Sequence, residues 1–163
     1  NSLLLAGCDP VIVVTGYREN EIIDRLTDWP VQIIGGANPD WPMSDSVRRA
    51  IEAVGRDTSG AKPAETTPAV LVLPGDHPAV DPDAIRTLIE AHESHPGTIH
   101  LPVFAGRSGH PALFPPEAFA ALATPDPDLG LRALLHNGPF PVIRHRIDDP
   151  GIMRNLDTPA DYT

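Results

Sequence analysis

The sequence predicts an α/β protein: a three-layer α/β/α sandwich with a mostly parallel sheet. Apolar runs typical of strands alternate with segments of helical periodicity along most of the chain. The runs at 10–15 and 69–73 are continuous and rich in Val, and each ends at Pro or Gly, as buried strands of a parallel sheet do. With 163 residues, the chain is expected to form a single domain over 1–163 with a sizeable core.

The first half of the chain gives the clearest alternation. Helices are expected where apolar residues recur at helical spacing, as Ile22, Ile23 and Leu26 do, and where a capping residue such as Ser44 or Asp81 precedes such a run. The expected elements are the tail of a helix at 1–6 stopped by Gly7, a strand at 10–15, a helix at 19–26, a strand at 31–34, a helix from Ser44, a strand at 69–73 and a helix capped by Asp81.

The second half is less regular. A strand is expected at 98–104, and Pro102 within it suggests an edge or a bulge. Further expected elements are a strand at 111–114, helices at 117–123 and 129–135, a strand at 142–147, and a last helix with Thr158 as its N-cap and Asp161 completing an acidic capping box. The polar, Gly- and Pro-rich segment 56–68 has no period and predicts an exposed, mobile loop.

Composition excludes several classes of function. The formal net charge is −10 and no run of Lys or Arg occurs, which argues against nucleic acid as a partner. Cys8 is the one cysteine of the sequence, so an internal disulfide and a Cys-cluster metal site are excluded. The sequence has neither a stretch of about 18 apolar residues nor a signal peptide, which predicts a cytoplasmic protein with no membrane partner.

The strand at 69–73 is followed by residues that could bind a ligand or take part in catalysis. Pro74 and Gly75 stop the strand, which leaves Asp76 at its carboxyl end. In open α/β sheets, ligands bind beyond these strand ends, and a carboxylate there suits a hard cation such as Mg²⁺. The alternative is that Asp76 only caps or turns the loop.

Other residues that could carry chemistry also lie at expected strand ends or in loops. Asn155 or Asp157 could supply a second oxygen ligand to Mg²⁺, although Asp157 could instead serve the turn that enters the last helix. Ser44 and Ser46 lie at a helix N-terminus, whose free N–H groups can bind an anion or a base carbonyl, or they could simply cap the helix. His110 could contact an acceptor substrate or be an ordinary turn histidine. His77 is a weaker catalytic candidate.

Several short motifs together resemble a known family. They are Val13–Gly16, Asn38-Pro39, Met43–Ser46, Leu73–Pro78, Gly109–Pro111, Leu129–Arg132 and Asp157–Asp161. Their order and spacing are similar to those of the MobA-like nucleotidyltransferases, closest to the molybdenum cofactor cytidylyltransferase branch. The resemblance runs from about Leu3 to the C-terminus.

The resemblance implies a nucleotide-diphospho-sugar-transferase-like fold and Mg²⁺-dependent transfer of a nucleoside monophosphate. CTP or another NTP would be the donor, a molybdopterin-type phosphate the acceptor, and pyrophosphate the second product. Asp76 would be catalytic and would bind the metal together with Asp157 and Asn155. Ser44, Ser46, Gly75 and His110 would contact the bound substrates.

The sequence departs from the family pattern in two places. The Gly-rich loop with Arg and Lys that cradles the triphosphate is not found, so the chain is expected to lack the first strand and this loop. Pro42 stands where the family usually has Gly before Met43. Three alternatives therefore stay open: a noncatalytic nucleotide-binding or interaction module, a sugar-nucleotidyltransferase or glycosyltransferase on the same fold, and a flavodoxin-like receiver, which would leave the Asp157 segment unexplained.

Overall fold

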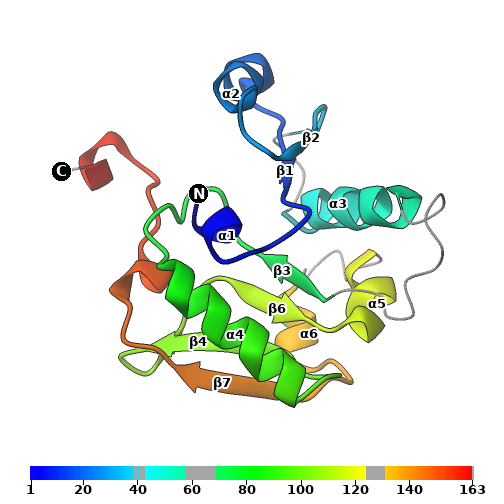
Figure 1. Ribbon diagram of the computed structural model, residues 1–163, viewed down its shortest axis with the longest axis vertical. Coiled ribbons are helices and arrows are strands. Elements are labelled where there is room, and N and C mark those ends of the chain that lie inside the picture. Colours follow the sequence, from blue (N-terminus) through cyan, green and yellow to red (C-terminus); the bar gives the residue numbers. More distant parts are fainter. Residues whose placement is uncertain (39, 41–42, 58–68, 124–130, 163) are drawn as a thin grey trace. The chain divides into compact units, whose positions relative to one another are not determined.

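The computed structural model describes residues 1–38, 40, 43–57, 69–123 and 131–162. The chain divides into two compact units. Unit 1 consists of Asn1–Cys8, Pro68–Glu117 and Pro139–Thr163, and unit 2 consists of Asp9–Thr67 and Ala118–Gly138. Helices and strands alternate along the chain, which confirms the predicted α/β class (Figure 1).

Unit 1 contains the larger sheet. Its elements are α1 (Ser2–Leu5), β3 (Val70–Val72), α4 (Pro82–Ser94), β4 (Ile99–Phe104), β5 (Arg107–Ser108), β6 (Ala112–Phe114), β7 (Val142–Arg146) and the 3-10 helices η2 (Pro150–Met153) and η3 (Pro159–Tyr162). A further 3-10 helix, η1 (Pro116–Ala118), spans the point in the sequence where unit 2 resumes.

The sheet of unit 1 is mixed. Its strand order is β3-β6-β4-β5, and β7 also pairs with β4. The β4–β7 pair is parallel, with Ile99 opposite Val142, whereas the pairs β3–β6, β6–β4 and β4–β5 are antiparallel. Helix α4 packs on β4 and β6, and Figure 1 shows it lying across the sheet.

Helix α4 forms as its sequence predicts. The Asp81 side chain accepts a hydrogen bond from the backbone N–H of Asp83, and Pro82 occupies the first helical turn. Ile85 and Leu88 are fully buried on its inner face. Ile85 belongs to a core cluster with Val80 and other apolar residues, including Ala84 and Ile152. Burial of this face stabilises unit 1 through the hydrophobic effect.

Unit 2 is built around a parallel pair of short strands. Its elements are β1 (Ile12–Val14), α2 (Glu19–Leu26), β2 (Gln32–Ile34), α3 (Met43–Asp57), α5 (Phe119–Ala123) and α6 (Arg132–His136). Ile12 is opposite Gln32 in the register. Helix α3 packs on β1 and α5, and its apolar residues Val47 and Ile51 are buried.

One expectation about the strands is wrong, and one of the two alternatives for Pro102 is excluded. The strand at 69–73 is half-buried, and its partner β6 runs antiparallel to it, because an apolar run reports burial but not the direction of the neighbouring strand. Strand β4 has neighbours on both sides, which excludes an edge at Pro102. The antiparallel register shifts between His100 opposite Leu113 and Val103 opposite Ser108, which agrees with the bulge, the other alternative. Pro102 is tolerated because the antiparallel ladder of β4 changes there, from β6 at His100 to β5 at Val103.

Some expectations fall outside the described residues. Helix α3 continues to Asp57, and the rest of the expected loop at 56–68 is not described. The helix expected at 129–135 is observed as α6 from Arg132, while residues 124–130 are not described.

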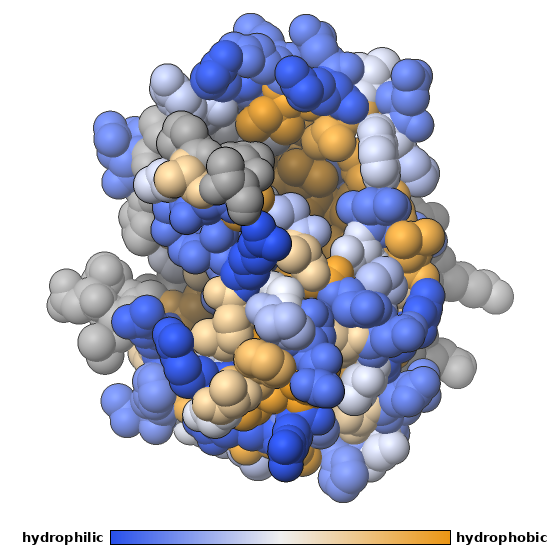
Figure 2. Space-filling model, turned by 90° about the vertical axis from the view of Figure 1, so that its left-hand side faces the viewer, coloured by the Kyte–Doolittle hydropathy of each residue, from blue (hydrophilic) through white to orange (hydrophobic). Residues whose placement is uncertain are grey.

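Both polar and apolar side chains reach the surface on the face shown in Figure 2. Apolar side chains there gather in groups, and hydrophilic side chains surround these groups. Among the residues that the structure describes, the large apolar ones with exposed side chains are Leu5, Tyr17, Trp29 and Met43. Within the described ranges, no helix combines the length and the apolar character needed to span a membrane.

Candidate functional site

The loop after β3 presents Asp76 and His77 side by side. The backbone N–H of His77 donates to the carbonyl of Pro74 at 3.2 Å, which closes a turn. The His77 ring donates from Nδ1 to Oδ1 of Asp76 at 2.7 Å, and the side chains of His77 and Asp76 are 12% and 40% exposed. A Cβ atom on Gly75 would meet no atom within 4 Å, so there is open space beside the loop. Asp76 is therefore an accessible carboxylate with one oxygen held by a neighbour.

The loop at His110 lies against the loop at His77. The two imidazole rings meet edge-on, with centroids 4.7 Å apart and planes at 71°. The backbone N–H of His110 donates to the carbonyl of Ile152 at 2.9 Å. A Cβ on Gly109 would lie 2.4 Å from the same carbonyl oxygen, so glycine is the residue that permits this approach.

Burial lowers the pKa of His110, and the nearby His77 lowers it further, while the Asp76 carboxylate acts in the opposite direction. Nδ1 of His110 is buried, and no hydrogen-bond partner for it occurs among the described residues. At neutral pH, His110 is thus favoured as a neutral imidazole, able to accept or donate one hydrogen bond.

The segment with Asn155 and Asp157 lies beside Asp76. The backbone N–H of Leu156 donates to the carbonyl of Asp76 at 2.8 Å, although about 80 residues separate the two in sequence. Nδ2 of Asn155 donates to Oδ2 of Asp157 at 2.6 Å, and both residues are exposed. The predicted proximity of these segments is confirmed by this pairing.

The start of the last helix has half of the expected capping box: Asp161 accepts from the backbone N–H of Thr158, but the Thr158 hydroxyl does not accept in return. Oδ2 of Asp161 accepts hydrogen bonds from the backbone N–H of Thr158 at 2.7 Å, from its hydroxyl at 2.9 Å and from the backbone N–H of Asp157 at 3.1 Å. The Thr158 hydroxyl is therefore a donor here, because a carboxylate is the stronger acceptor. These bonds, those from Thr158 first, lower the pKa of Asp161. In the described part of this segment, Asp161 maintains the turn, whereas the Asp157 side chain accepts from Asn155.

Asp76 is a carboxylate of the kind that binds hard cations, and the segment with Asn155 and Asp157 is paired with its backbone. In the described part of the chain, no group of three or more His, Cys, Asp and Glu side chains is arranged to hold a metal ion. Mg²⁺ rarely needs such a group, since it is commonly held by one or two carboxylates, water and substrate phosphates. Asp76 together with an oxygen of Asn155 or Asp157 fits that pattern.

Ser44 and Ser46 lie in unit 2, at the start of α3. The helix begins at Met43, so Ser44 is inside the first turn and is not the N-cap that the sequence suggested. Ser44 is buried and Ser46 is half-buried. The backbone N–H groups of this first turn lack carbonyl partners within the helix, so they can bind an acceptor.

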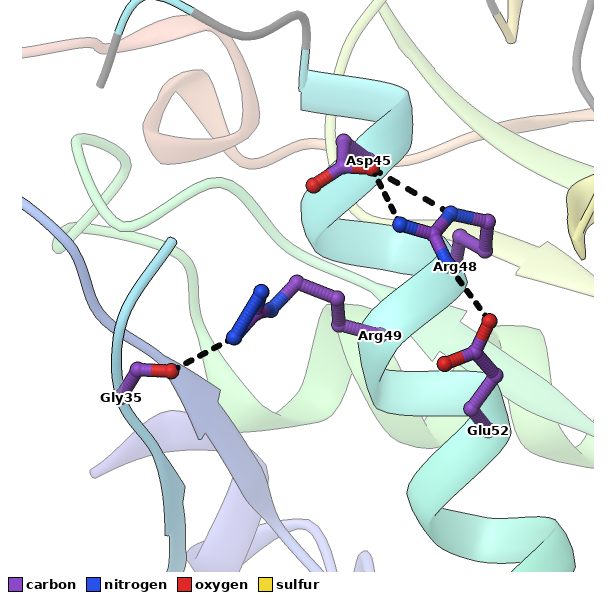
Figure 3. A network of polar contacts seen from close by, with 5 residues as sticks. All are labelled: Gly35, Asp45, Arg48, Arg49 and Glu52. Carbon is purple, nitrogen blue, oxygen red and sulfur yellow. Dashed lines mark hydrogen bonds and ion pairs between the residues drawn. The ribbon is translucent and has the colours of Figure 1, made fainter. Parts of the chain in front are cut away.

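Two arginines fix the surroundings of α3 (Figure 3). Arg48 forms ion pairs of 2.5 Å with Asp45 and with Glu52 on its own helix, and these carboxylates raise its pKa. Arg49 reaches from the helix to the carbonyl of Gly35 at 2.8 Å and thereby ties α3 to the chain that follows β2.

From the sequence, little weight was given to two residues: Asp161, which contacts the segment paired with Asp76, and His77, which contacts Asp76 itself. Asp161 orders the turn next to Asp157, and its signal was its position three residues after Thr158. His77 holds the Asp76 carboxylate, and its signal was its place directly after Asp76 in a turn.

Comparison with known protein families identifies the class to which this α/β protein belongs. The MobA-like NTP transferase domain family matches residues 1–145, and the chain belongs to this family. It is 30% identical to the molybdenum cofactor cytidylyltransferase of Escherichia coli (strain K12) over 162 residues, which cover 97% of this chain and 74% of that protein.

Solved structures show the same fold. Rv0371c from Mycobacterium tuberculosis H37Rv has a TM-score of 0.79 at 24% identity, with 99% of this chain and 77% of that chain covered. A complex of Rv0371c with manganese has a TM-score of 0.76 at 24% identity and covers 99% and 79%. A nucleotidyl transferase from Methanothermobacter thermautotroptrophicus has a TM-score of 0.75 at 24% identity and covers 99% and 73%.

Proposed function

We propose that this nucleotidyltransferase-family chain transfers CMP from CTP to a molybdopterin-type phosphate and releases pyrophosphate, with Mg²⁺ as its cofactor. The observation that carries the proposal is the hydrogen bond from the backbone N–H of Leu156 to the carbonyl of Asp76, which joins two segments of unit 1 that contain carboxylate and amide side chains. The choice of base and acceptor is supported by the identity with the E. coli cytidylyltransferase.

In this proposal, Asp76 is the principal metal ligand, and Asn155 or Asp157 gives the second oxygen. Phosphoryl transfer depends on positioning and charge neutralisation more than on covalent chemistry. Bound Mg²⁺ supplies that neutralisation to the phosphate oxygens. Gly75 adds no side chain to the loop, and the open space beside it leaves room for a phosphate group.

His110 is proposed to contact the acceptor. Its lowered pKa, caused first by burial, favours a neutral ring that can form a hydrogen bond without adding a charge. Ser44 and Ser46 are proposed to contact the nucleotide. The N–H groups of the first turn of α3 and the Ser46 hydroxyl could donate to the O2 and N3 acceptors of cytosine.

The test is pyrophosphate release by the full-length protein with Mg²⁺, molybdenum-loaded molybdopterin and each NTP in turn. We expect CTP to give the fastest turnover. Faster turnover with GTP would assign the protein to guanylyl transfer, and absence of turnover with every NTP would favour a noncatalytic nucleotide-binding module.

A variant of Asp76, the proposed metal ligand, tests the role of this residue directly. Asp76→Asn keeps the shape of the side chain and removes its charge, so turnover should fall by about 100-fold or more, as when a transition-state contact is lost. The circular dichroism spectrum should stay unchanged, because Asp76 is accessible and contributes little packing. Asp148→Asn, at an exposed carboxylate after β7, is the control and should retain wild-type turnover. Full activity of Asp76→Asn would rule out the assigned role.

A further inference from the structure

His77 has a defined geometry that the proposed reaction does not use. A carboxylate accepts hydrogen bonds, so the 2.7 Å contact between His77 and Asp76 requires the proton on Nδ1 of the ring. The His77 side chain is only 12% exposed, compared with 40% for Asp76. The donor is therefore the more sheltered partner of the pair.

The His77 ring is itself held on two sides. Its backbone N–H is bound to the carbonyl of Pro74, which fixes the turn. Its ring meets the edge of His110, whose own backbone is bound to Ile152. Neighbouring residues in a chain often point apart, so this contact depends on the turn and on the ring of His110.

Asp76 is consequently fixed at both ends. Its backbone carbonyl accepts from Leu156, and its Oδ1 accepts from His77. Within the described ranges, the other carboxylate oxygen, Oδ2, has no hydrogen-bond partner and is the oxygen available to a cation. A carboxylate held in one rotamer loses less side-chain entropy when it binds a metal ion.

We propose that His77 is a positioning residue that holds the Asp76 carboxylate in the orientation for binding a divalent cation. The proposal rests on the proposed function, in which Asp76 is the metal ligand. Hydrogen-bond partners of metal ligands typically change metal affinity 10- to 100-fold when they are removed. The same range is expected for His77.

The choice of variants follows from the atom that makes the bond. The amide nitrogen of asparagine can take the place of Nδ1 of histidine, whereas that of glutamine takes the place of Nε2. His77→Asn should therefore keep the hydrogen bond to Asp76, and His77→Gln should lose it. Both variants lose the ring contact with His110, so a difference between them isolates the hydrogen bond.

The experiment measures Mn²⁺ binding to the full-length protein from the loss of the free-ion signal in electron paramagnetic resonance, without nucleotide. We expect the dissociation constant to rise about 10- to 100-fold in His77→Gln. His77→Asn should stay within about threefold of wild type, which is well below that range. His136→Gln, at an exposed histidine of α6, is the control and should bind as wild type does. Thermal unfolding without metal checks that each variant is folded.

The outcomes separate this inference from the proposed function. If Asp76→Asn loses Mn²⁺ binding while His77→Gln binds as wild type, His77 does not position the ligand and Asp76 stays assigned. Equal loss in His77→Asn and His77→Gln would also overturn the inference, because the hydrogen bond would not be the cause. If Asp76→Asn binds Mn²⁺ as wild type does, both the metal assignment and the role of His77 are refuted.

Discussion

A group of histidines between β4, β7 and α4 should make the stability of the protein depend on pH. His100 is completely buried, and its Nδ1 lies 2.9 Å from Nε2 of His145. The Thr98 hydroxyl donates its one proton to the carbonyl of His95 at 2.8 Å. Nε2 of His100, 2.6 Å from the same hydroxyl oxygen, must then be the donor of that pair. It follows that Nδ1 of His100 accepts from Nε2–H of His145.

This arrangement favours neutral rings. Burial lowers the pKa of His100, and positive charge on His145, His92 or His95 would lower it further, although the carbonyl of His95 acts in the opposite direction. Burial also lowers the pKa of His145, with a smaller effect from His95. If both rings of the His100–His145 pair were protonated, two N–H groups would face each other. The folded state therefore resists the uptake of protons by this pair.

The sign and size of the effect follow from linkage. An unfolded histidine has a pKa of about 6.5, so the unfolded chain takes up protons first as the pH falls. The contribution of these neutral histidines to the free energy of unfolding is complete above that pH and is lost as the pH falls below it. The loss is about 1.4 kcal/mol per pH unit for each histidine that is neutral in the folded state and protonated in the unfolded state. Between pH 7 and 5.5, the loss is at most about 1.3 kcal/mol for one histidine and about 2.5 kcal/mol for two.

The perturbation is His145→Gln, whose amide nitrogen can replace Nε2 as the donor to His100 but cannot be protonated. Urea unfolding at pH values from 5.5 to 7.5 gives the free energy of unfolding. As the pH is lowered, we expect the free energy of unfolding to decrease less steeply in the variant than in wild type, with slopes that differ by up to about 1.4 kcal/mol per pH unit. His136→Gln removes an exposed histidine and should keep the wild-type slope. Parallel curves for His145→Gln and wild type would refute the reasoning.

Two further predictions concern packing. Gly109→Ala should destabilise unit 1 by about 1–3 kcal/mol, because the added Cβ would lie 2.4 Å from the carbonyl oxygen of Ile152. Gly75→Ala should destabilise it far less, because the Cβ added there would have no atom within 4 Å. Equal melting temperatures for these two variants would contradict this. Ile85→Ala should cost about 2–5 kcal/mol in urea unfolding, because the side chain is fully buried, while Glu90→Ala on the exposed face of α4 should change stability by less than about 0.5 kcal/mol. A loss below about 1 kcal/mol for Ile85→Ala would show that α4 is not part of the core.

The elements that local sequence determines were predicted well. The helix at 19–26 was found at the predicted residues, and α4 begins with the Asp81 cap and Pro82 as expected. Capping and apolar spacing act within a few residues, so a single sequence reveals them. The direction of the strand paired with β3 depends on a segment about 40 residues later, which explains why the apolar run suggested a parallel neighbour.

In the candidate site, the residues marked by a local sequence pattern were predicted, whereas contacts that depend on the folded structure were not. Asp76 could be selected because Pro74 and Gly75 end a strand directly before it. The role of His77 depends on a rotamer and on the ring of His110, which no local pattern reports. Thr158 was expected to cap the last helix, but the competition between a hydroxyl and a carboxylate is decided by the geometry of the folded turn.

The loops of unit 1 that carry the proposed chemistry are joined mainly through the backbone. Leu156 binds the carbonyl of Asp76, His110 binds the carbonyl of Ile152, and the rings of His77 and His110 complete the set of contacts. Because two of these three links do not involve a side-chain functional group, the loops should keep their places when Asp76 is changed to Asn. The side chains can then be varied one at a time, and a loss of cation binding or turnover can be attributed to the atom removed and not to a displaced loop.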